Sequence, residues 1–392
     1  MVRIWLFEIG YWELALLGVL LLAFVYEIYF YARYMWVRGK NGANGDAALN
    51  DANDERPGVS VIVCARNEGY NLRPYVQSLL TQDYPTYEVI IVNDGSEDDT
   101  QAVIDEYAAL DKRVKTTFVP KGARVRSTKK LGLTLAAKAA QYDYLLLTDA
   151  DCRPESTKWI REMMAGFGKG ERLAVSGERI EVVLGFGAYF WEDSLLNGVI
   201  QYDTLFNGVH YLGAAATGKP YMGVGRNLAY RKETFFEHGG FTDLMTEGAG
   251  DDDLFVNKVA TKYNTAVVCS RESITWSVPE NRWKNWLQQK RRHLSVSGGY
   301  SAKSKRHLVR EPMARGLFYL LFIVLMAVGS PLVMSAAYVL FLLRLIVQVT
   351  MMDVCAQRLG QHKMGLEVVW YDMMLPVVTG VMMLLPKRRE IW

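Results

Sequence analysis

The sequence predicts an α/β domain with a mostly parallel sheet, flanked on both sides by apolar segments. Three observations predict it. Short apolar runs alternate with helical patterns between residues 58 and 150, as in sheets buried on both faces. Charged and polar residues stand directly after these runs. Apolar stretches long enough to cross a bilayer, about 20 residues, precede and follow the domain.

Composition excludes several classes of protein. Half of the 392 residues are hydrophobic and 22% are charged, which excludes a disordered chain. Four cysteines are too few for a disulfide framework. A net charge of only +3 argues against binding nucleic acid through bulk charge, so no nucleic-acid partner is expected.

The N-terminal apolar run predicts one transmembrane helix within residues 1–38. The run spans residues 11–35, and aromatic residues stand at both of its ends, as in an interfacial belt. Basic residues follow directly, at Arg33, Arg38 and Lys40. Positive charge favours the inner side of a membrane, so the next segment is expected in the cytoplasm.

The rest of the chain divides by composition. The expected parts are a polar linker (39–57), a soluble domain (58–282), basic interfacial helices (283–312), a transmembrane hairpin (313–352) and a further membrane segment (364–386). The hairpin is predicted because Gly329-Ser330-Pro331 interrupts its apolar run.

Counting the spans leaves one conflict. With the N-terminus outside, four spans place Lys387-Arg388-Arg389 outside as well, although basic residues favour the inside. Either the last segment lies in the membrane interface or the hairpin is counted wrongly.

Within the domain, four apolar and β-rich runs predict parallel strands. They cover residues 59–65, 87–92, 114–119 and 142–147. Helical patterns lie between them, over residues 72–80, 98–110 and 128–140. No G-x-G-x-x-G follows the first run, and the chain has no P-loop. Nicotinamide chemistry and ATPase-type phosphate binding are therefore disfavoured.

The polar residues after these runs should meet at one edge of the sheet. Arg66 and Glu68 follow the first run, Asp94 the second, and Asp149 and Asp151 the fourth. Ligands of open parallel sheets bind at the carboxyl ends of the strands. Two carboxylates one residue apart can hold Mg²⁺ or Mn²⁺, and through it a pyrophosphate. A solvated acidic turn is the rival interpretation, and the apolar strand before it favours the metal site.

A second acidic cluster, Asp251-Asp252-Asp253, precedes a predicted helix over residues 254–262. Three adjacent carboxylates repel one another, so one should have a raised pKa, which suits a general base. The same residues could instead stabilise the start of the helix as capping anions.

Basic residues form two further clusters. Residues 288–293 include Arg291 and Arg292, and Arg suits a diphosphate because it forms bidentate hydrogen bonds. The rival interpretation is a basic helix on anionic lipid, because more basic residues follow before the hairpin. Lys129 and Lys130 could neutralise phosphates or lie on a solvated surface.

In this order the motifs resemble the family-2 glycosyltransferases, over residues 60 to about 300. Residues 61–68 are similar to the family's first strand and its P-x-(R/Y)-N-E turn, with Cys64-Ala65 in place of Pro. Residues 93–96 are similar to (D/N)DGS, and Asp149-Ala150-Asp151 matches the metal-binding D-x-D. Residues 225–231 resemble the G-x-N-x-A-x-R segment on the acceptor side.

Two later motifs match the family less closely. Residues 250–254 stand where the family has its E-D catalytic base, and alignment on the Gly favours Asp252 whereas alignment on the final Asp-Leu favours Asp251. Residues 289–293 resemble Q-x-x-R-W, with His293 in place of the Trp, or with Arg292 in its place if the motif starts at Gln288. The missing Trp argues against processive polymerisation.

The resemblance implies a GT-A fold, which is a Rossmann-like, mostly parallel sheet, as a cytoplasmic domain with N-terminal and C-terminal transmembrane helices. It implies Asp251 or Asp252 as catalytic base, and Mg²⁺ or Mn²⁺ on Asp149 and Asp151. The expected donor contacts are Ala65, Arg66, Glu68, Asp94, Lys129, Asp149, Gln289 and Arg292. The expected acceptor contacts are Arg226, Asn227 and His293.

The implied reaction is an inverting transfer of a sugar from a nucleotide-sugar donor to a lipid-linked or glycan acceptor, next to membrane lipids. Two alternatives stay open: a processive polysaccharide synthase of the same family, and a non-catalytic membrane scaffold with a degenerate transferase domain. A nucleotidyltransferase should show a Gly-rich phosphate loop after the first strand, and that loop is missing.

Overall fold

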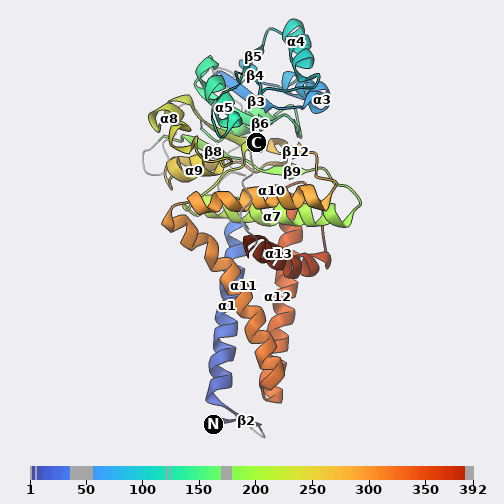
Figure 1. Cartoon of the computed structure of the whole chain (residues 1–392). Helices are drawn as coiled ribbons and strands as arrows, with labels where there is room; N and C mark the ends of the chain where they lie inside the picture. The colour runs from blue at the N-terminus through green and yellow to red at the C-terminus, as the bar shows by residue number, and fades with distance from the viewer. Residues whose placement is uncertain are drawn as a thin grey trace.

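The computed structural model describes residues 2–4, 7–35, 56–120, 122–123, 125–168 and 179–384. Most of the predicted linker, residues 39–55, and the basic residues 387–389 lie outside these ranges. Figure 1 shows an α/β domain that stands on a layer of crosswise helices, with a stalk of long helices below.

The domain is built on a seven-stranded sheet with the strand order β11-β8-β10-β6-β3-β4-β5. Its four parallel strands are those predicted: β3 (Val59–Ala65), β4 (Tyr87–Asn93), β5 (Val114–Phe118) and β6 (Tyr144–Asp149). They confirm the mostly parallel α/β fold.

The other half of the sheet is mixed. Strand β10 (Leu228–Arg231) runs antiparallel to both β6 and β8 (Val182–Leu184), and β11 (Thr265–Val267) runs parallel to β8. A separate sheet has the order β7-β12-β9, from β7 (Cys152–Pro154), β12 (Thr275–Ser277) and β9 (Gly187–Tyr189). These strands of three or four residues are too short to show a period in the sequence. The pair β1 (Val2–Ile4) and β2 (Phe7–Ile9) precedes the first helix.

Helices cover both faces of the main sheet, as the continuous apolar strands require. In β3 the side chains alternate: Val61 and Val63 belong to one buried cluster and Ile62 to the other. The first cluster includes residues of α3 (Gly69–Leu80), α4 (Thr100–Leu110) and α6 (Trp159–Ala165). The second includes residues of α5 (Thr128–Ala139), α7 (Leu195–Ala216), α8 (Lys232–Glu237) and α9 (Asp253–Val259).

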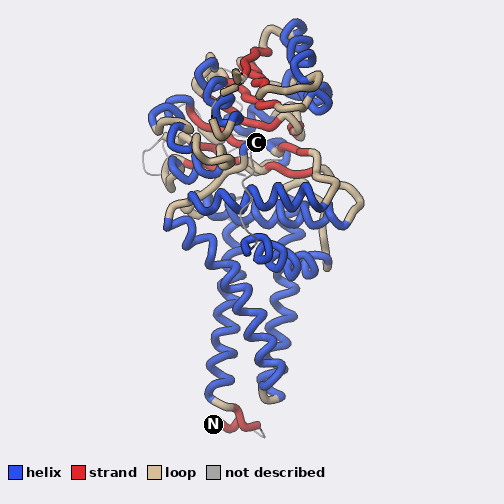
Figure 2. Tube along the Cα trace, in the orientation of Figure 1, coloured by secondary structure: helices blue, strands red, loops and turns tan. Residues whose placement is uncertain are grey.

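Two crosswise helices, α7 and α10 (Trp283–Val296), lie between the sheets and the stalk (Figure 2). The stalk consists of α1 (Tyr11–Met35), α11 (Ala302–Val328) and α12 (Pro331–Arg358). These three are the described helices that are long and apolar enough to cross a membrane. Leu20, Phe24 and Phe318 pack between them. Leu22 and Ile346 are exposed, as suits contact with lipid.

The structure divides the C-terminal region differently from the expectation. The basic residues 302–312 are not separate interfacial helices, because they form the first turns of α11, which is a candidate span. The hairpin breaks at Gly329-Ser330, as predicted. The last apolar block forms α13 (Glu367–Leu384), which is not among the three candidate spans. In Figure 1 it lies across the top of the stalk, and it contacts α7, α10 and α12.

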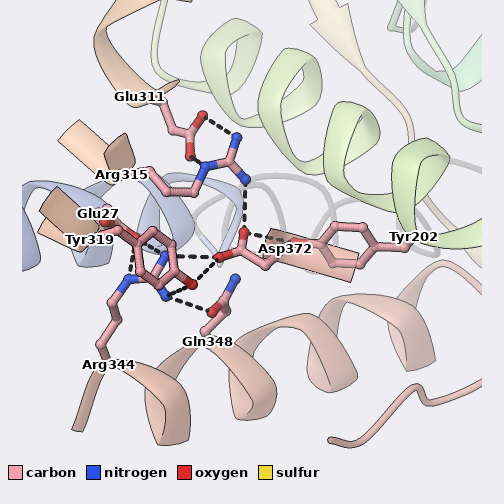
Figure 3. A network of polar contacts seen from close by, with 8 residues as sticks. All are labelled: Glu27, Tyr202, Glu311, Arg315, Tyr319, Arg344, Gln348 and Asp372. Atoms are coloured by element: carbon pink, nitrogen blue, oxygen red, sulfur yellow. Dashed lines mark hydrogen bonds and ion pairs between the residues drawn. The ribbon is translucent and has the colours of Figure 1, made fainter. Parts of the chain in front are cut away.

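A cluster of buried charges, centred on Asp372 of α13, joins the stalk to the domain (Figure 3). The Asp372 carboxylate accepts hydrogen bonds from Arg315 of α11 (2.7 Å) and Arg344 of α12 (3.0 Å). Tyr202 of α7 donates to the same carboxylate at 3.1 Å. Arg344 also pairs with Glu27 of α1 at 2.8 Å. Helices α7, α11, α12 and α13 therefore meet at one fully buried carboxylate, and α1 joins them through the pair of Glu27 and Arg344.

We expect Asp372→Ala to destabilise the protein by about 3 kcal/mol or more, because it leaves two buried guanidinium groups short of negative charge. The measurement is the melting temperature of the purified full chain in detergent. Glu367→Ala on the same helix is the control, because Glu367 is exposed and its loss should cost less than about 1 kcal/mol. Equal losses in the two variants would contradict the central role of Asp372.

Candidate active site

The loops after β3 and β4 are fastened to each other by hydrogen bonds. Asn67 adopts a left-handed backbone (φ 56°), which Asn tolerates better than most residues. Its backbone N–H donates to Ser96 Oγ at 3.0 Å, and its side-chain oxygen accepts from Glu97 N at 2.8 Å. Asp94 N donates to the Ala65 carbonyl at 2.8 Å. The two loops therefore form one rigid edge at the carboxyl ends of their strands.

Two of the expected donor-binding carboxylates lie at this edge. Thr128 donates to Asp94 at 2.8 Å, and Asn71 donates to Glu68 at 2.7 Å. Burial raises the pKa of Asp94, although the Thr128 hydrogen bond and nearby Arg66 oppose the shift. Burial also raises the pKa of Glu68, and the charges of Asp151 and Asp149 add to the shift. The exposed Arg66 side chain stands beside them.

Asp149 and Asp151 come together at the end of β6, as the sequence predicts for the D-x-D motif. One ligand atom each from Asp149, Asp151 and Cys152 lie within 4.8 Å of one another. Burial alone would raise the pKa of Asp149, but the Lys129 ammonium outweighs it and lowers that pKa. Burial, and then the charge of Asp149, raise the pKa of Asp151. The negative charge of Asp149 is thus balanced by Lys129, whereas that of Asp151 is balanced less well.

Lys129 joins the two acidic clusters. Its Nζ lies 2.9 Å from Asp149 Oδ1 and 3.4 Å from Asp251 Oδ2. Its side chain and that of Asp149 each keep about a third of their exposure. The lysine therefore stands inside the predicted site, between the D-x-D motif and the residues considered as base.

The neighbouring Lys130 has a structural role. It is fully buried, and burial lowers its pKa. Its Nζ donates to the backbone carbonyls of Leu244, Glu247 and Ala249 at 2.8–2.9 Å. These bonds hold the loop that leads into the second acidic cluster.

The three adjacent aspartates have three different surroundings. Asp251 faces Lys129. Asp252 accepts one backbone hydrogen bond on each oxygen, from Gly225 N at 2.6 Å and Asp253 N at 2.8 Å. Burial, and then the charge of Asp251, raise the pKa of Asp252 to about 6. Burial raises the pKa of Asp253 well above its usual range, and Tyr300 hydrogen-bonds to it. Capping and a raised pKa, which the sequence offered as alternatives, coexist in Asp252.

The segment after α7 contributes Arg226 and Asn227. The Arg226 guanidinium stacks on Tyr189 and contacts Ser277 Oγ at 3.2 Å, and its charge acts on Asp149 and Asp151. Asn227 is fully buried. Its amide nitrogen donates to the carbonyls of Phe186 and Ser273, and its amide oxygen accepts from Trp159 Nε1. A buried amide group that is hydrogen-bonded within the protein has no free surface for an acceptor, which corrects the direct acceptor contact expected of Asn227.

Helix α10 brings the Q-x-x-R segment near the D-x-D motif. Arg292 acts electrostatically on Asp149, Gln289 is half-buried, and His293 is exposed. The charges of Arg292, Arg226, Lys290 and Lys129 all act on His293, so positive side chains gather around this part of α10. Between them Lys290 forms a buried ion pair with Asp203 of α7 and fixes the two crosswise helices together.

The acidic residues present fit a divalent cation. Asp149 and Asp151 supply hard oxygen ligands, which Mg²⁺ and Mn²⁺ prefer. The raised pKa of Asp151 shows that its negative charge lacks full compensation, which a cation would provide. Cys152 was not predicted from the sequence. It stands next to the motif as a neutral thiol, because burial raises its pKa. The thiol donates to Asp151 Oδ1 at 3.3 Å, and its sulfur lies 2.9 Å from Ser277 Oγ.

Residues 60–235 match the family model described as glycosyl transferase family 2. With the predicted sheet and motifs in place, this region is a family-2 glycosyltransferase domain. The chain is also similar in fold, over 93% of its length, to a mannosyltransferase from Pyrobaculum calidifontis that was solved with GDP-Man and Mn²⁺. The match covers 97% of that chain, with a TM-score of 0.54 and 16% identity. It supports the GT-A fold.

Two curated relatives are similar over shorter stretches. An uncharacterised glycosyltransferase of Haemophilus influenzae is 26% identical over 165 residues, which is 39% of this chain and 50% of that protein. A poly-β-1,6-N-acetyl-D-glucosamine synthase of Staphylococcus epidermidis is 34% identical over 94 residues, 24% of this chain and 22% of the synthase. The aligned parts therefore span half or less of these relatives.

Separate substitutions of the two adjacent lysines should show that Lys130 stabilises the loop before the acidic cluster, whereas Lys129 belongs to the active site. Lys130→Met removes the donor from three buried carbonyls and should cost at least about 2 kcal/mol of stability. Lys129→Met should cost less, because its carboxylate partners keep some access to water. The measurement is the melting temperature of each full-chain variant. A larger loss for Lys129→Met would show that the roles are assigned the wrong way round.

Proposed function

We propose that this protein transfers a sugar from a nucleotide-sugar donor to a membrane-associated acceptor, with inversion at the anomeric carbon and with a divalent metal. The acceptor is a lipid-linked molecule or a glycan delivered to the membrane. The observation that carries the proposal is the meeting of Asp149 and Asp151 with Lys129 and the aspartates before α9 at one edge of the sheet. The complex of the Pyrobaculum protein with GDP-Man and Mn²⁺ supports the same donor class and metal.

The proposed donor site is the rigid edge formed by the loops after β3 and β4. Asp94 accepts from the nucleoside, while Arg66 and Arg292 approach the diphosphate with their positive charge. Asp149 and Asp151 would hold Mg²⁺ or Mn²⁺, which when bound neutralises the diphosphate and makes it a better leaving group. Lys129 contributes a further positive charge on the same side.

For the general base we favour Asp252 over Asp251. Backbone donors hold each Asp252 oxygen by one hydrogen bond, so a second lone pair stays available for the proton of the acceptor hydroxyl. A pKa of about 6 matches a base that works near neutral pH. Asp251 is engaged by the Lys129 ammonium, and we assign it to positioning that lysine.

We further propose that the domain is cytoplasmic and that α13 lies on the same side. The exposed basic residues Lys303, Lys305 and Arg306 stand at the domain end of the stalk, which favours that end being inside. Three spans, rather than four, also return the chain to the domain side after α12. The contacts of α13 with α7 and α10 support this arrangement, in which the span count has no conflict.

The main alternative is processive synthesis, because a polysaccharide synthase is among the relatives. The exposed His293, where processive members have Trp, favours addition of one or a few sugars. Product length, measured by mass spectrometry of the glycosylated acceptor, separates the two possibilities.

Removal of the metal ligands tests the proposal as a whole. Asp149→Asn and Asp151→Asn should each lower the release of nucleoside diphosphate from UDP- or GDP-sugars by at least about 100-fold. Turnover of the unchanged chain should stop when EDTA is added and return with Mg²⁺ or Mn²⁺. Asp105→Asn, on the exposed side of α4, is the charge-matched control and should keep full turnover. Turnover that survives both aspartate substitutions would refute the metal site.

The pH dependence of turnover tests the base. Asp252 must be deprotonated to accept a proton, so kcat/KM should fall about tenfold per pH unit below a pKa of about 6 and level off above it. Asp252→Asn should lower the rate by about 100-fold or more and abolish this acid limb. Asp251→Asn should lower the rate less and keep the limb. The reverse pattern would make Asp251 the base.

A further inference from the structure

We propose that the domain end of the stalk binds the phosphate group of a membrane lipid, at a site built around Arg33 of α1. The proposal stands apart from the glycosyl transfer above, because it rests on residues outside the active site and is tested without a donor.

Arg33 is a buried cation without a carboxylate partner. Its side chain retains 3% exposure, and none of the ion pairs between described residues includes it. One guanidinium nitrogen lies 3.1 Å from His307 Nε2, and Nε has no hydrogen-bond partner. The guanidinium also lies over the Phe30 ring at 3.9 Å. A ring compensates a buried charge only in part, so an anion is the missing partner.

A second buried nitrogen nearby also lacks a partner. His210 of α7 packs against the same Phe30 ring, with centroids 4.8 Å apart, and its Nε2 makes no hydrogen bond. His307 of α11 also stacks on Phe30, with ring centroids 5.9 Å apart. Buried polar groups are nearly always hydrogen-bonded, so two orphaned nitrogens around one ring indicate a ligand with acceptor oxygens.

The charge around this group is positive. Arg310 and Lys219 act electrostatically on His307, and Arg310 also hydrogen-bonds Tyr26 of α1. Glu311 follows Arg310 directly in the sequence, but its carboxylate is already paired with Arg315. Three different elements therefore direct cations at one place, which suits a phosphate.

The start of α11 gives independent support. Its first turns carry the exposed cations Lys303, Lys305 and Arg306, and its first turn has no acidic residue. Cations near a helix N-terminus oppose the helix dipole and destabilise the first turn. An anionic surface beside these residues would offset that destabilisation.

The position along the stalk agrees with lipid phosphate. Arg33 is the last residue of the first candidate span, and His307 lies near the beginning of the second. Apolar spans end where the headgroups of the bilayer begin. Phosphate oxygens of lipids therefore lie at the level of the Arg33 site.

Melting temperatures of the purified, delipidated full chain in an uncharged detergent test the site. The added lipids are phosphatidylglycerol, a phosphodiester; a polyprenyl phosphate, a phosphomonoester; and diacylglycerol, which has no phosphate. Lipids that bind only the folded state raise the melting temperature, and the increase grows with the ratio of lipid concentration to dissociation constant. We expect both phosphate lipids to raise it and diacylglycerol to leave it unchanged. A stronger effect of the phosphodiester identifies the ligand as a resident phospholipid. A stronger effect of the phosphomonoester identifies it as a lipid-linked substrate.

Arg33→Gln should weaken the apparent affinity for the phosphate lipids about tenfold or more. In the absence of lipid it should not lower the melting temperature, because no carboxylate loses its partner. Arg33→Lys, which keeps the charge but loses the forked geometry, should give an intermediate affinity. Lys112→Gln, an exposed change in the domain, is the control for net charge and should behave as the unchanged chain.

Three results would overturn the proposal. The first is an Arg33→Gln variant that melts lower by the same amount with and without lipid, as a purely structural residue would. The second is an equal effect of diacylglycerol and the phosphate lipids. The third is a loss of lipid response in Lys112→Gln as large as that in Arg33→Gln.

Discussion

The buried Asp372 carboxylate is the contact on which the position of the domain depends. Arg315 and Arg344 come from the two helices of the hairpin, and Tyr202 comes from the crosswise helix α7. Taking such charges out of water is costly, and only the close match of donors and acceptors repays it. The arrangement tolerates little displacement, so the catalytic domain has a defined height and rotation relative to the spanning helices.

The crosswise helices transmit this position to the site. The buried pair of Lys290 and Asp203 holds α10 on α7, and Arg292 on the neighbouring turn acts on Asp149. The active site is thus adjacent to a helix that lies between the sheets and the stalk. An acceptor drawn from the membrane surface would reach the donor along this route, which agrees with a transferase that works on a membrane-associated substrate.

Much of the fold follows from local patterns. Strands β3, β4 and β6 are continuous apolar runs because both faces of the sheet are covered, and such runs are distinctive in a sequence. The short strands β8 and β10 could not be predicted, because their pairing depends on partners far along the chain. The same holds for Asn227, whose motif suggested an acceptor contact but whose amide group is consumed by backbone contacts.

The sequence by itself determined the sheet, the spanning helices and the gathering of carboxylates at the strand ends, because these depend on hydrophobic period and on the rule that parallel strands end at one edge. Only the tertiary structure assigned different roles to adjacent residues of the same type. Lys129 and Lys130 have the same side chain, yet one faces Asp149 and the other three carbonyls. Asp251 and Asp252 likewise differ only in what surrounds them. Burial and partner charge set the chemistry of such groups, and both arise only when distant segments meet.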